Sequence, residues 1–246
     1  MLKIANHPIY RHELPKGHRF PMEKYDLLPQ QLIYEGTCTE ENFFEPEVPN
    51  YKHFFTVHDP EYFFDLLNIT LNQKAARKIG FPLSEVLIER EMVIADGTMK
   101  ASEFAIENGT AEIFRNDASV FTFSMHGKSN YPFIKEKSDL DIALKNATKD
   151  AEYLAILKEI LPRLIQQEKP DFIYYLCGVD VIETDKLGKL GLTINGCKER
   201  DNFVLQTCFD LKIPVMCSMG GGYSLDINII VNAHANTFRL AQEIYF

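Results

Sequence analysis

Two apolar segments of the chain end in polar sequences that can carry chemistry. The first, Phe172 to Cys177, is followed by Gly178-Val179-Asp180, so a carboxylate comes just past a run of strand length. The second, Ile213 to Met219, is followed by Gly220-Gly221-Gly222-Tyr223. Ligands of open parallel sheets bind beyond the carboxyl ends of the strands. If both runs are strands of one sheet, a carboxylate and a tyrosine hydroxyl reach the same rim.

Each of these sequences also has a simpler structural explanation. On periodicity alone, Asp180 is equally well explained as a helix cap or a turn residue. The glycines Gly220 to Gly222 allow positive φ angles and close approach of the backbone, which a tight turn also requires. A phosphate-binding loop is the weaker alternative, because the pattern G-x-x-x-x-G-K-[ST] is absent from the chain.

The elements expected to position these residues alternate between strand and helix. Val120 to Ser124 has the β-branched and aromatic composition of a buried strand. Glu152 to Gln167 carries apolar residues at helical spacing. Asn195 is expected to cap a further helix, and Asp226 to start a final one. Short apolar strands alternating with amphipathic helices predict an α/β protein with a mostly parallel sheet flanked by helices.

The first part of the chain is expected to be less regular. Residues 1–60 are rich in proline and hold only short apolar runs, which predicts loops. Asp59-Pro60 offers an N-cap followed by proline at the first helical position. A longer helix is expected after Ser84, running toward Glu107. No linker or repeat divides the sequence, so we expect a single domain over residues 1–246.

Composition excludes several classes of protein. The chain has 246 residues and a net charge of −9, which disfavours direct binding to a nucleic-acid backbone. It has no apolar stretch of the roughly 18 residues that a membrane span needs, and no signal-peptide apolar region, so a cytoplasmic location is expected. The five cysteines lack a C-x-x-C pair, which favours free thiols in the core over a disulfide framework.

Several strings in the second half resemble the histone deacetylase superfamily, closest to its class IV and bacterial deacetylase-like branch. The matching strings are Gly109-Thr110-Ala111-Glu112-Ile113-Phe114, Phe123-Ser124-Met125-His126, Gly178-Val179-Asp180, Thr184-Asp185-Lys186-Leu187-Gly188, Leu192-Thr193-Ile194 and Gly220-Gly221-Gly222-Tyr223. The amino-terminal segments His18 to Tyr25 and His58 to Tyr62 resemble the same branch. The resemblance implies the arginase–deacetylase α/β fold and zinc-dependent hydrolysis of acyl-lysine or a related acylated amine.

The resemblance also assigns roles to residues of this chain. It makes Asp180 one of three zinc ligands and Tyr223 the donor that polarises the scissile carbonyl, since zinc activates water and a placed donor stabilises the oxyanion. It matches Tyr131, Gly221 and Gly222 to the substrate tunnel. It also implies a structural monovalent cation such as K⁺, whose matching positions are Phe114, Asp117, Val120, Ser124 and Met125.

The family pattern is interrupted at Asn108-Gly109. Ahead of the Gly109 string, family members carry a strand ending in D-x-D-x-H-x-G-N-G, which supplies the other two zinc ligands, and earlier a His-His pair that handles protons. Both are absent here. We expect an internal deletion of roughly fifty residues, enough to remove a central strand–helix segment of about 30 or more. The seven histidines are expected to be surface residues or hydrogen-bonded core residues rather than replacement ligands.

Three hypotheses about function therefore stay open. The first is a zinc-dependent deacetylase-family hydrolase whose chain, as written, binds zinc poorly and does not hydrolyse acetyl-lysine, because a catalytic zinc normally takes three protein ligands. The second is a non-catalytic domain that binds acyl-lysine or acts as a scaffold. The third is a defective, truncated member of the family. The oligomeric state is not predictable from the sequence.

Overall fold

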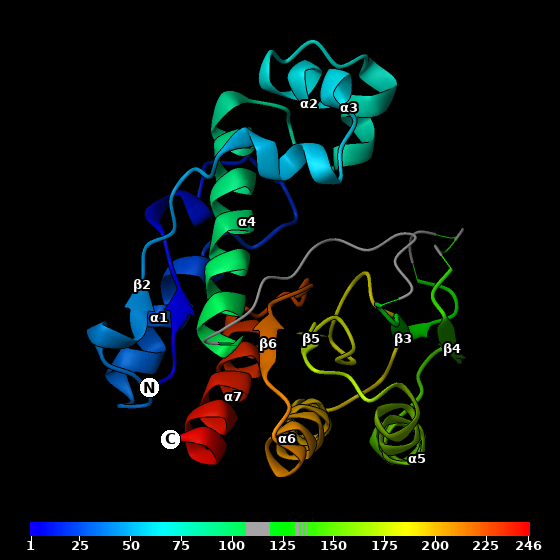
Figure 1. The fold of residues 1–246 in the computed structure, drawn as a ribbon. Helices are drawn as coiled ribbons and strands as arrows, with labels where there is room; N and C mark the ends of the chain where they lie inside the picture. The colour runs from blue at the N-terminus through cyan, green and yellow to red at the C-terminus, as the bar shows by residue number, and fades with distance from the viewer. Residues whose placement is uncertain (107–118, 131–132, 134, 136) are drawn as a thin grey trace. The chain divides into compact units, whose positions relative to one another are not determined.

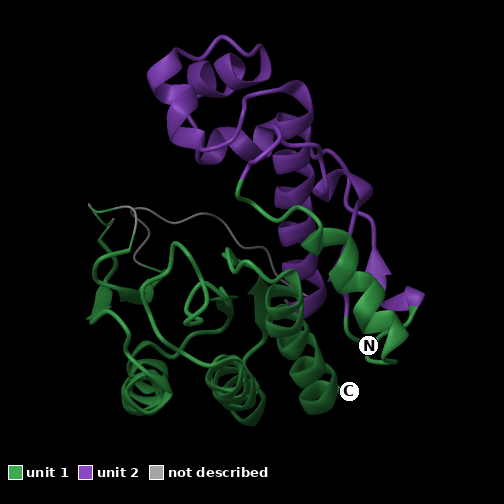
Figure 2. Cartoon of the chain, turned by 180° about the vertical axis from the view of Figure 1, so that it is seen from behind, with its two compact units in different colours: residues 1–2, 19–39, 116–246 green, residues 3–18, 40–115 purple. Residues whose placement is uncertain are grey.

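The computed structural model describes residues 1–106, 119–130, 133, 135 and 137–246 (Figure 1). The chain forms two compact units (Figure 2). The first unit comprises residues 1–2, 19–39 and 116–246, and the second comprises residues 3–18 and 40–115. The expected single domain over residues 1–246 stays a prediction.

The strands of the first unit form parallel pairs. Among its described residues, β3 (Phe123–Gly127) pairs with β4 (Leu140–Leu144), and β5 (Ile173–Leu176) pairs with β6 (Val215–Ser218). Phe123 lies opposite Leu140, and the two pairs are separate two-stranded sheets. Parallel strands separated by helices confirm the predicted α/β class.

One layer of helices packs against both pairs of strands. α5 (Asp150–Glu168), α6 (Ile194–Leu211) and α7 (Ile227–Tyr245) lie in a row beneath the strands in Figure 1. The largest core cluster joins α5 and α6 to all four strands. Its buried members are Leu144, Tyr153, Leu154, Leu157, Leu190, Leu192, Val204 and Cys208, and Phe123, Met125, Ile142, Ile173, Tyr175 and Val215 pack against them. Both strand pairs therefore share one core.

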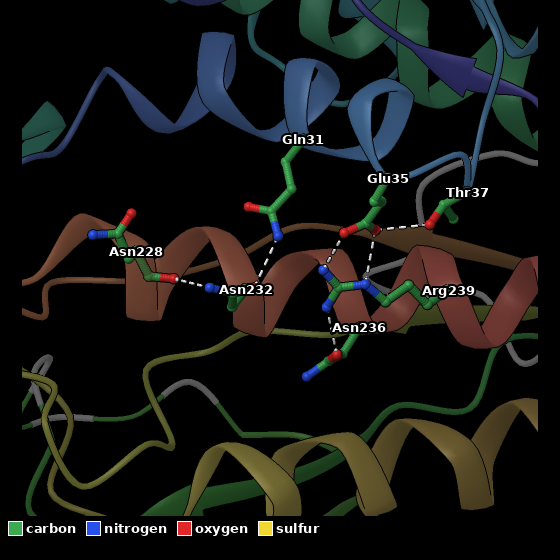
Figure 3. A network of polar contacts seen from close by, with 7 residues as sticks. All are labelled: Gln31, Glu35, Thr37, Asn228, Asn232, Asn236 and Arg239. Atoms are coloured by element: carbon green, nitrogen blue, oxygen red, sulfur yellow. Dashed lines mark hydrogen bonds and ion pairs between the residues drawn. The ribbon is translucent and has the colours of Figure 1, made fainter.

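The first unit also contains α1 (Lys24–Tyr34), which packs along α7. Figure 3 shows the polar contacts between them. Gln31 Nε2 donates to Asn232 Oδ1 at 2.8 Å, and the Arg239 guanidinium donates to both carboxylate oxygens of Glu35 at 2.8 and 2.6 Å. The hydrogen bond from Arg239 is the main cause of a lowered Glu35 pKa, ahead of the opposing effect of burial.

The prediction of loops throughout residues 1–60 is wrong at α1. Pro29 lies inside this helix and removes one backbone hydrogen bond. Leu28 and Leu32, one helical turn apart, are both buried. Tertiary packing of such an apolar stripe outweighs a local helix breaker, and proline content alone does not reveal it.

The second unit is mainly helical. A short β1 (Ile4–Ala5) pairs in parallel with β2 (Phe43–Phe44), and short 3₁₀ helices cover Pro8–Tyr10, Glu40–Asn42 and Tyr51–Thr56. Its helices are α2 (Pro60–Leu67), α3 (Gln73–Ile79) and α4 (Glu85–Ile106). Its core cluster is built on Phe63, Ile88 and Met92. None of the described helices of the chain is long and apolar enough to cross a membrane.

The structure tests the predicted helix caps. Asp59 accepts from Tyr62 N at 3.1 Å, Ser84 accepts from Leu87 N at 3.2 Å, and Asp226 accepts from Asn228 N at 2.9 Å, so the predicted cap Asp59 and the predicted helix starts at Ser84 and Asp226 are confirmed. The predicted cap Asn195 is wrong. Thr193 caps α6 instead, because its hydroxyl accepts from Gly196 N at 2.9 Å. The strand predicted at Val120 begins at Phe123.

Candidate functional site

The segments after β5 and β6 run side by side, as the sequence predicted. The strand ladder continues past both strand ends, since Cys177 N donates to Ser218 O and Val179 N donates to Gly220 O, each at 3.0 Å. Asp180 and the glycine turn before Tyr223 therefore meet at the carboxyl end of neighbouring parallel strands. This is the rim at which open α/β sheets bind ligands.

The glycine turn is packed directly against the aspartate. Gly221 and Gly222 have φ angles of +66° and +98°, in the region that favours glycine. A Cβ on Gly221 would lie 2.7 Å from Asp180 Cβ, and one on Gly222 would lie 2.8 Å from Ile230 Cγ2. The tight turn suggested by the sequence is present, and it is shaped to bring the backbone close to Asp180.

Alanine at Gly222 is expected to destabilise the chain more than alanine at Gly36. Gly36 also has a positive φ, +77°, but a Cβ there would meet nothing within 4 Å. Gly36→Ala should therefore show backbone strain alone, about 1–2 kcal/mol. Gly222→Ala adds overpacking against Ile230, a further cost of about 1–3 kcal/mol. Urea unfolding of both variants measures the difference, and equal losses would show that the turn can relax.

Asp185 joins the rim to the loop that follows β5. Its Oδ1 accepts from Leu187 N at 2.8 Å and from Gly188 N at 2.7 Å, while its Oδ2 accepts from Tyr223 N at 2.7 Å. The side chain is nearly buried. One carboxylate thus fixes the backbone on both sides of the rim. Asp185 lies in the string Thr184 to Gly188 that resembles the family, but no role was predicted for it.

Lys24 reaches the rim from the start of α1. Its Nζ donates to Gly221 O at 2.7 Å and lies 4.6 Å from the centroid of the Phe20 ring. The Phe20 ring in turn meets Tyr223 edge-on, with 5.7 Å between centroids. Lys24 is buried, so its charge is shielded from solvent. Lys24 was not among the residues predicted for the site.

The surroundings of the two candidate functional side chains shift their pKa values. Burial is the largest cause of the raised pKa of Asp180, and the charge of Asp185 adds to it, while Arg200 and Lys24 oppose it. Burial also raises the pKa of Tyr223, followed by the charges of Asp185, Tyr25 and Asp180. The Tyr223 hydroxyl therefore keeps its proton at neutral pH and is available as a donor.

A buried ion pair supports the backbone just before Asp180. Arg200 Nη1 donates to Gly178 O at 2.7 Å, and its Nε donates to Asp201 Oδ1 at 2.9 Å. Asp201 also accepts from the Tyr175 hydroxyl at 2.5 Å and from Thr237 Oγ1 at 2.7 Å. The side chains of Arg200 and Asp201 are 5% and 0% exposed. This cluster connects the end of β5 to α6 and α7.

His234 lies beneath the glycine turn. A Cβ on Gly222 would lie 3.7 Å from His234 Nε2. The imidazole is buried, and neither ring nitrogen has a hydrogen-bond partner among the described residues. Burial is the main cause that lowers its pKa to about 3, with Lys24 and Arg200 contributing, and the nearby Gly221 carbonyl only partly offsets them. His234 is therefore a core histidine, which is one of the two expected alternatives, and the Gly221 carbonyl lies beside its ring.

The donor set around Asp180 does not fit a zinc site. No group of three His, Cys, Asp or Glu side chains able to hold a metal ion occurs in the part of the chain that the structure describes. The nearby carboxylate of Asp185 uses both oxygens to accept backbone N–H groups. A catalytic zinc normally takes three protein ligands. The roles expected for Asp180 and Tyr223 in the family's chemistry stay predictions.

The remaining residues singled out in the sequence lie elsewhere. Tyr131, Phe114 and Asp117 are outside the described residues. Val120 precedes β3, while Ser124 and Met125 lie on that strand, in a different strand pair from the Asp180 rim. Ser124 Oγ is 2.9 Å from His126 Nδ1. The substrate-tunnel and monovalent-cation assignments stay predictions.

Comparison with solved structures identifies the class of fold. The chain superimposes on the acetylpolyamine aminohydrolase from Burkholderia pseudomallei with a TM-score of 0.73 and 15% identity, covering 98% of this chain and 99% of that one. It superimposes on a histone deacetylase homologue from Aquifex aeolicus with a TM-score of 0.75 and 16% identity, covering 98% and 83%. The fold is the arginase–deacetylase α/β fold.

The sequence comparison names the family. The histone deacetylase domain matches residues 106–238, more than half of the chain. This protein therefore belongs to the histone deacetylase family. Histone deacetylase 2 of Arabidopsis thaliana is 28% identical over 119 residues, which cover 47% of this chain and 31% of that protein. Human histone deacetylase 1 is 26% identical over 129 residues, or 48% and 26%. These two matches span less than a third of either relative.

A longer match reveals a difference in length. An uncharacterized protein of Picosynechococcus is 32% identical over 296 aligned positions, covering 98% of this chain and 99% of the relative. Because this chain has only 246 residues, at least 50 of the 296 positions are gaps in it. The expected internal deletion of roughly fifty residues stays a prediction. The expected junction, Asn108-Gly109, lies outside the described residues, so its position stays a prediction.

Proposed function

We propose that the Asp180–Tyr223 rim is what this chain retains of an amidohydrolase site for acyl-lysine or related acylated amines, and that the chain does not turn over such substrates. The observation that carries the proposal is the placement of a partly buried aspartate and of a tyrosine with a raised pKa just past the ends of two neighbouring parallel strands. A preorganised hydroxyl can donate to an amide carbonyl and stabilise negative charge that develops on its oxygen.

Hydrolysis needs more than this donor. An amide must also be attacked by an activated water, and its leaving amine must receive a proton. In this family, a metal with three protein ligands and a pair of histidines supply these functions, and the described rim offers neither set. The chain is therefore expected to bind an acylated amine without cleaving it.

The proposed substrate class is supported by two similar solved structures and by the net charge of the chain. One similar structure is an acetylpolyamine aminohydrolase, and another is a histone deacetylase homologue in complex with SAHA. The net charge of −9 is compatible with cationic amines, because a negative field favours approach of a cationic ligand. A scaffold role without acyl binding is the second hypothesis, and the same experiment separates the two.

The test compares the chain with a repaired form. The repaired form carries, between Asn108 and Gly109, the stretch of the Picosynechococcus relative that this chain lacks. For the present chain, we expect far less than one zinc per chain by elemental analysis and no hydrolysis of an acetyl-lysine peptide or an acetylated polyamine. For the repaired chain, we expect about one zinc per chain and measurable turnover, which Tyr223→Phe abolishes.

Tyr34→Phe is the matched control, because Tyr34 is 94% exposed and should not affect turnover. Stoichiometric zinc and turnover in the present chain, abolished by Tyr223→Phe, would refute the absence of activity. Zinc without turnover in the repaired chain would refute the assignment of the rim to an amidohydrolase site. Binding of a non-hydrolysed acetyl-lysine peptide to the present chain separates a binding site from a scaffold.

A further inference from the structure

Two exposed lysines lie next to the rim. Lys186 directly follows Asp185, whose Oδ2 accepts from Tyr223 N at 2.7 Å. Lys189 directly follows a glycine whose backbone packs against the carbonyl oxygen of Asp180. Both lysines are exposed, and neither ammonium group has an ion pair within the described part of the chain. The loop after β5 therefore presents two positive charges beside the rim.

The loop after β4 adds positive charge to the same border. Ala147 N donates to Lys189 O at 2.7 Å, so the loop after β4 runs beside the loop after β5. Lys145 and Lys149, on either side of Ala147, are both exposed. Lys149 forms an ion pair with Glu183, with 2.7 Å between Nζ and Oε2. Three of the four lysines are thus without a carboxylate partner among the described residues.

Acidic side chains are fewer on this border. In the two loops, residues 145–149 and 178–193, the exposed charged residues are the four lysines and Glu183. The other carboxylates of these loops are buried or partly buried. The segment after β6 contributes one exposed acid, Asp226, which caps α7. The surface beside the rim is therefore positively charged, although the whole chain carries a net charge of −9.

The local charge determines which ligands the rim favours. At physiological ionic strength, interactions between exposed charges are screened over about 8 Å. A ligand at the rim therefore interacts mainly with the charged side chains beside it. The four lysines favour a ligand that carries negative charge next to the rim, and like-charge contacts disfavour a cationic one. The net charge of −9 attracts cationic ligands only at longer range, where screening weakens it.

We propose that the rim takes acetyl-lysine side chains that are carried by acidic polypeptide segments. This preference rests on the proposed function, in which the rim holds the acylated amine. Residues of an extended segment are about 3.4 Å apart, so carboxylates one or two positions from an acetyl-lysine lie within about 7 Å of it along the backbone. The flexible four-carbon side chain of lysine can adjust to such neighbours. Lys186 and Lys189 are the lysines that contact the acidic residues beside the acetyl-lysine.

The experiment compares acetyl-lysine peptides that differ only in their flanking charges. Each labelled peptide carries one central acetyl-lysine, with two glutamates, two glutamines or two arginines on each side of it. In fluorescence anisotropy at low salt, we expect the glutamate peptide to bind the unmodified chain about tenfold more tightly than the arginine peptide, with the glutamine peptide between them. At about 1 M salt, where the screening length falls to about 3 Å, the difference should largely disappear.

A reversal of charge tests the two lysines themselves. In the variant Lys186→Glu with Lys189→Glu, the arginine peptide should bind more tightly than the glutamate peptide. Loss of the fold would weaken the binding of every peptide and could not reverse their order. The matched control is Lys169→Glu with Lys212→Glu, which changes the net charge by the same amount. Lys169 and Lys212 are exposed and precede β5 and β6, at the amino ends of these strands, so the control should keep the order of the parent chain.

The outcomes separate this inference from the proposed function. Equal binding of the glutamate and arginine peptides, or the same reversal in the control variant, would overturn the inference and leave the acyl-lysine site in place. Displacement of the glutamate peptide by an equimolar single-stranded oligonucleotide would overturn the choice of an acidic polypeptide. A glutamate peptide that binds equally well with norleucine in place of acetyl-lysine would instead refute the proposed function, because the rim would not hold the acyl group. Absence of binding by every peptide would refute both.

Discussion

Replacement of His234 by leucine is expected to remove most of the loss of stability that the folded chain suffers between pH 6.5 and pH 3. In the folded chain, burial lowers the pKa of His234 to about 3. In the unfolded chain, an imidazole titrates near 6.5. Below pH 6.5 the unfolded state therefore binds a proton that the folded state does not, and acidification favours unfolding.

The sign and size of this effect follow from proton linkage. The contribution of neutral His234 to stability is fully present above pH 6.5 and is lost as the pH falls toward 3. The slope is about 1.4 kcal/mol per pH unit, so the total is about 3–5 kcal/mol. At pH 7 the His234→Leu variant should be as stable as the parent chain or more stable, because two buried nitrogens without partners are removed.

Urea unfolding at pH 7, 5 and 4 measures the effect. The parent should lose stability steeply across this series, and His234→Leu should lose much less. His53→Leu is the matched control because His53 is exposed, and it should follow the parent. If the parent and His234→Leu have the same pH dependence, the imidazole is not neutral and buried in the folded chain.

Substitution of Asp201 by alanine is expected to cost about 3–5 kcal/mol of the free energy of unfolding, because it leaves the Arg200 charge buried without its carboxylate. Asp201 is fully buried and accepts from Arg200, Tyr175 and Thr237. Removal of the Asp201 carboxylate would leave the donors of these three residues without this acceptor. This is the largest effect expected from a single substitution outside the rim itself.

A double variant separates the charge from the packing. Replacing a buried ion pair by apolar residues of similar volume is often neutral or stabilising, so Arg200→Met with Asp201→Leu should be more stable than Asp201→Ala. The partly exposed pair of Glu35 and Arg239 is the control, with side chains 24% and 28% exposed. Glu35→Gln should cost about 1 kcal/mol or less. A cost for Asp201→Ala no larger than this would show that the cluster does not support the fold.

The alternation of strand and helix was predictable because its signals are local. Glu152 to Gln167 shows its helical stripe within one window of sequence, and α5 forms there. Asp226 and Asp59 indicate the starts of helices, because aspartate is a preferred N-cap residue. The very short β1 and β2 leave too few residues for a period of two to be recognised.

The rim was only partly predictable. Asp180 and Tyr223 could be paired in advance because each follows an apolar run. The contact of Lys24 with Gly221 joins residues 197 positions apart, and no local pattern encodes it. The Arg200–Asp201 pair looks like an ordinary exposed charge pair within a helix sequence, and only tertiary packing buries it. His234 occupies the same helical stripe as Ile230, which was the available sign of its burial.

The docking of α1 on α7 sets an order for the maturation of the chain. Gln31 and Glu35 find their partners 201 and 204 residues later, and Lys24 finds Gly221 197 residues later. These contacts cannot form until residues 221–239 have left the ribosome, while β5, α6 and β6 are close in sequence and can assemble earlier. Completion of the rim therefore waits for the synthesis of α7, and a ribosome that stops before α7 releases a chain whose α1 has no surface to dock on.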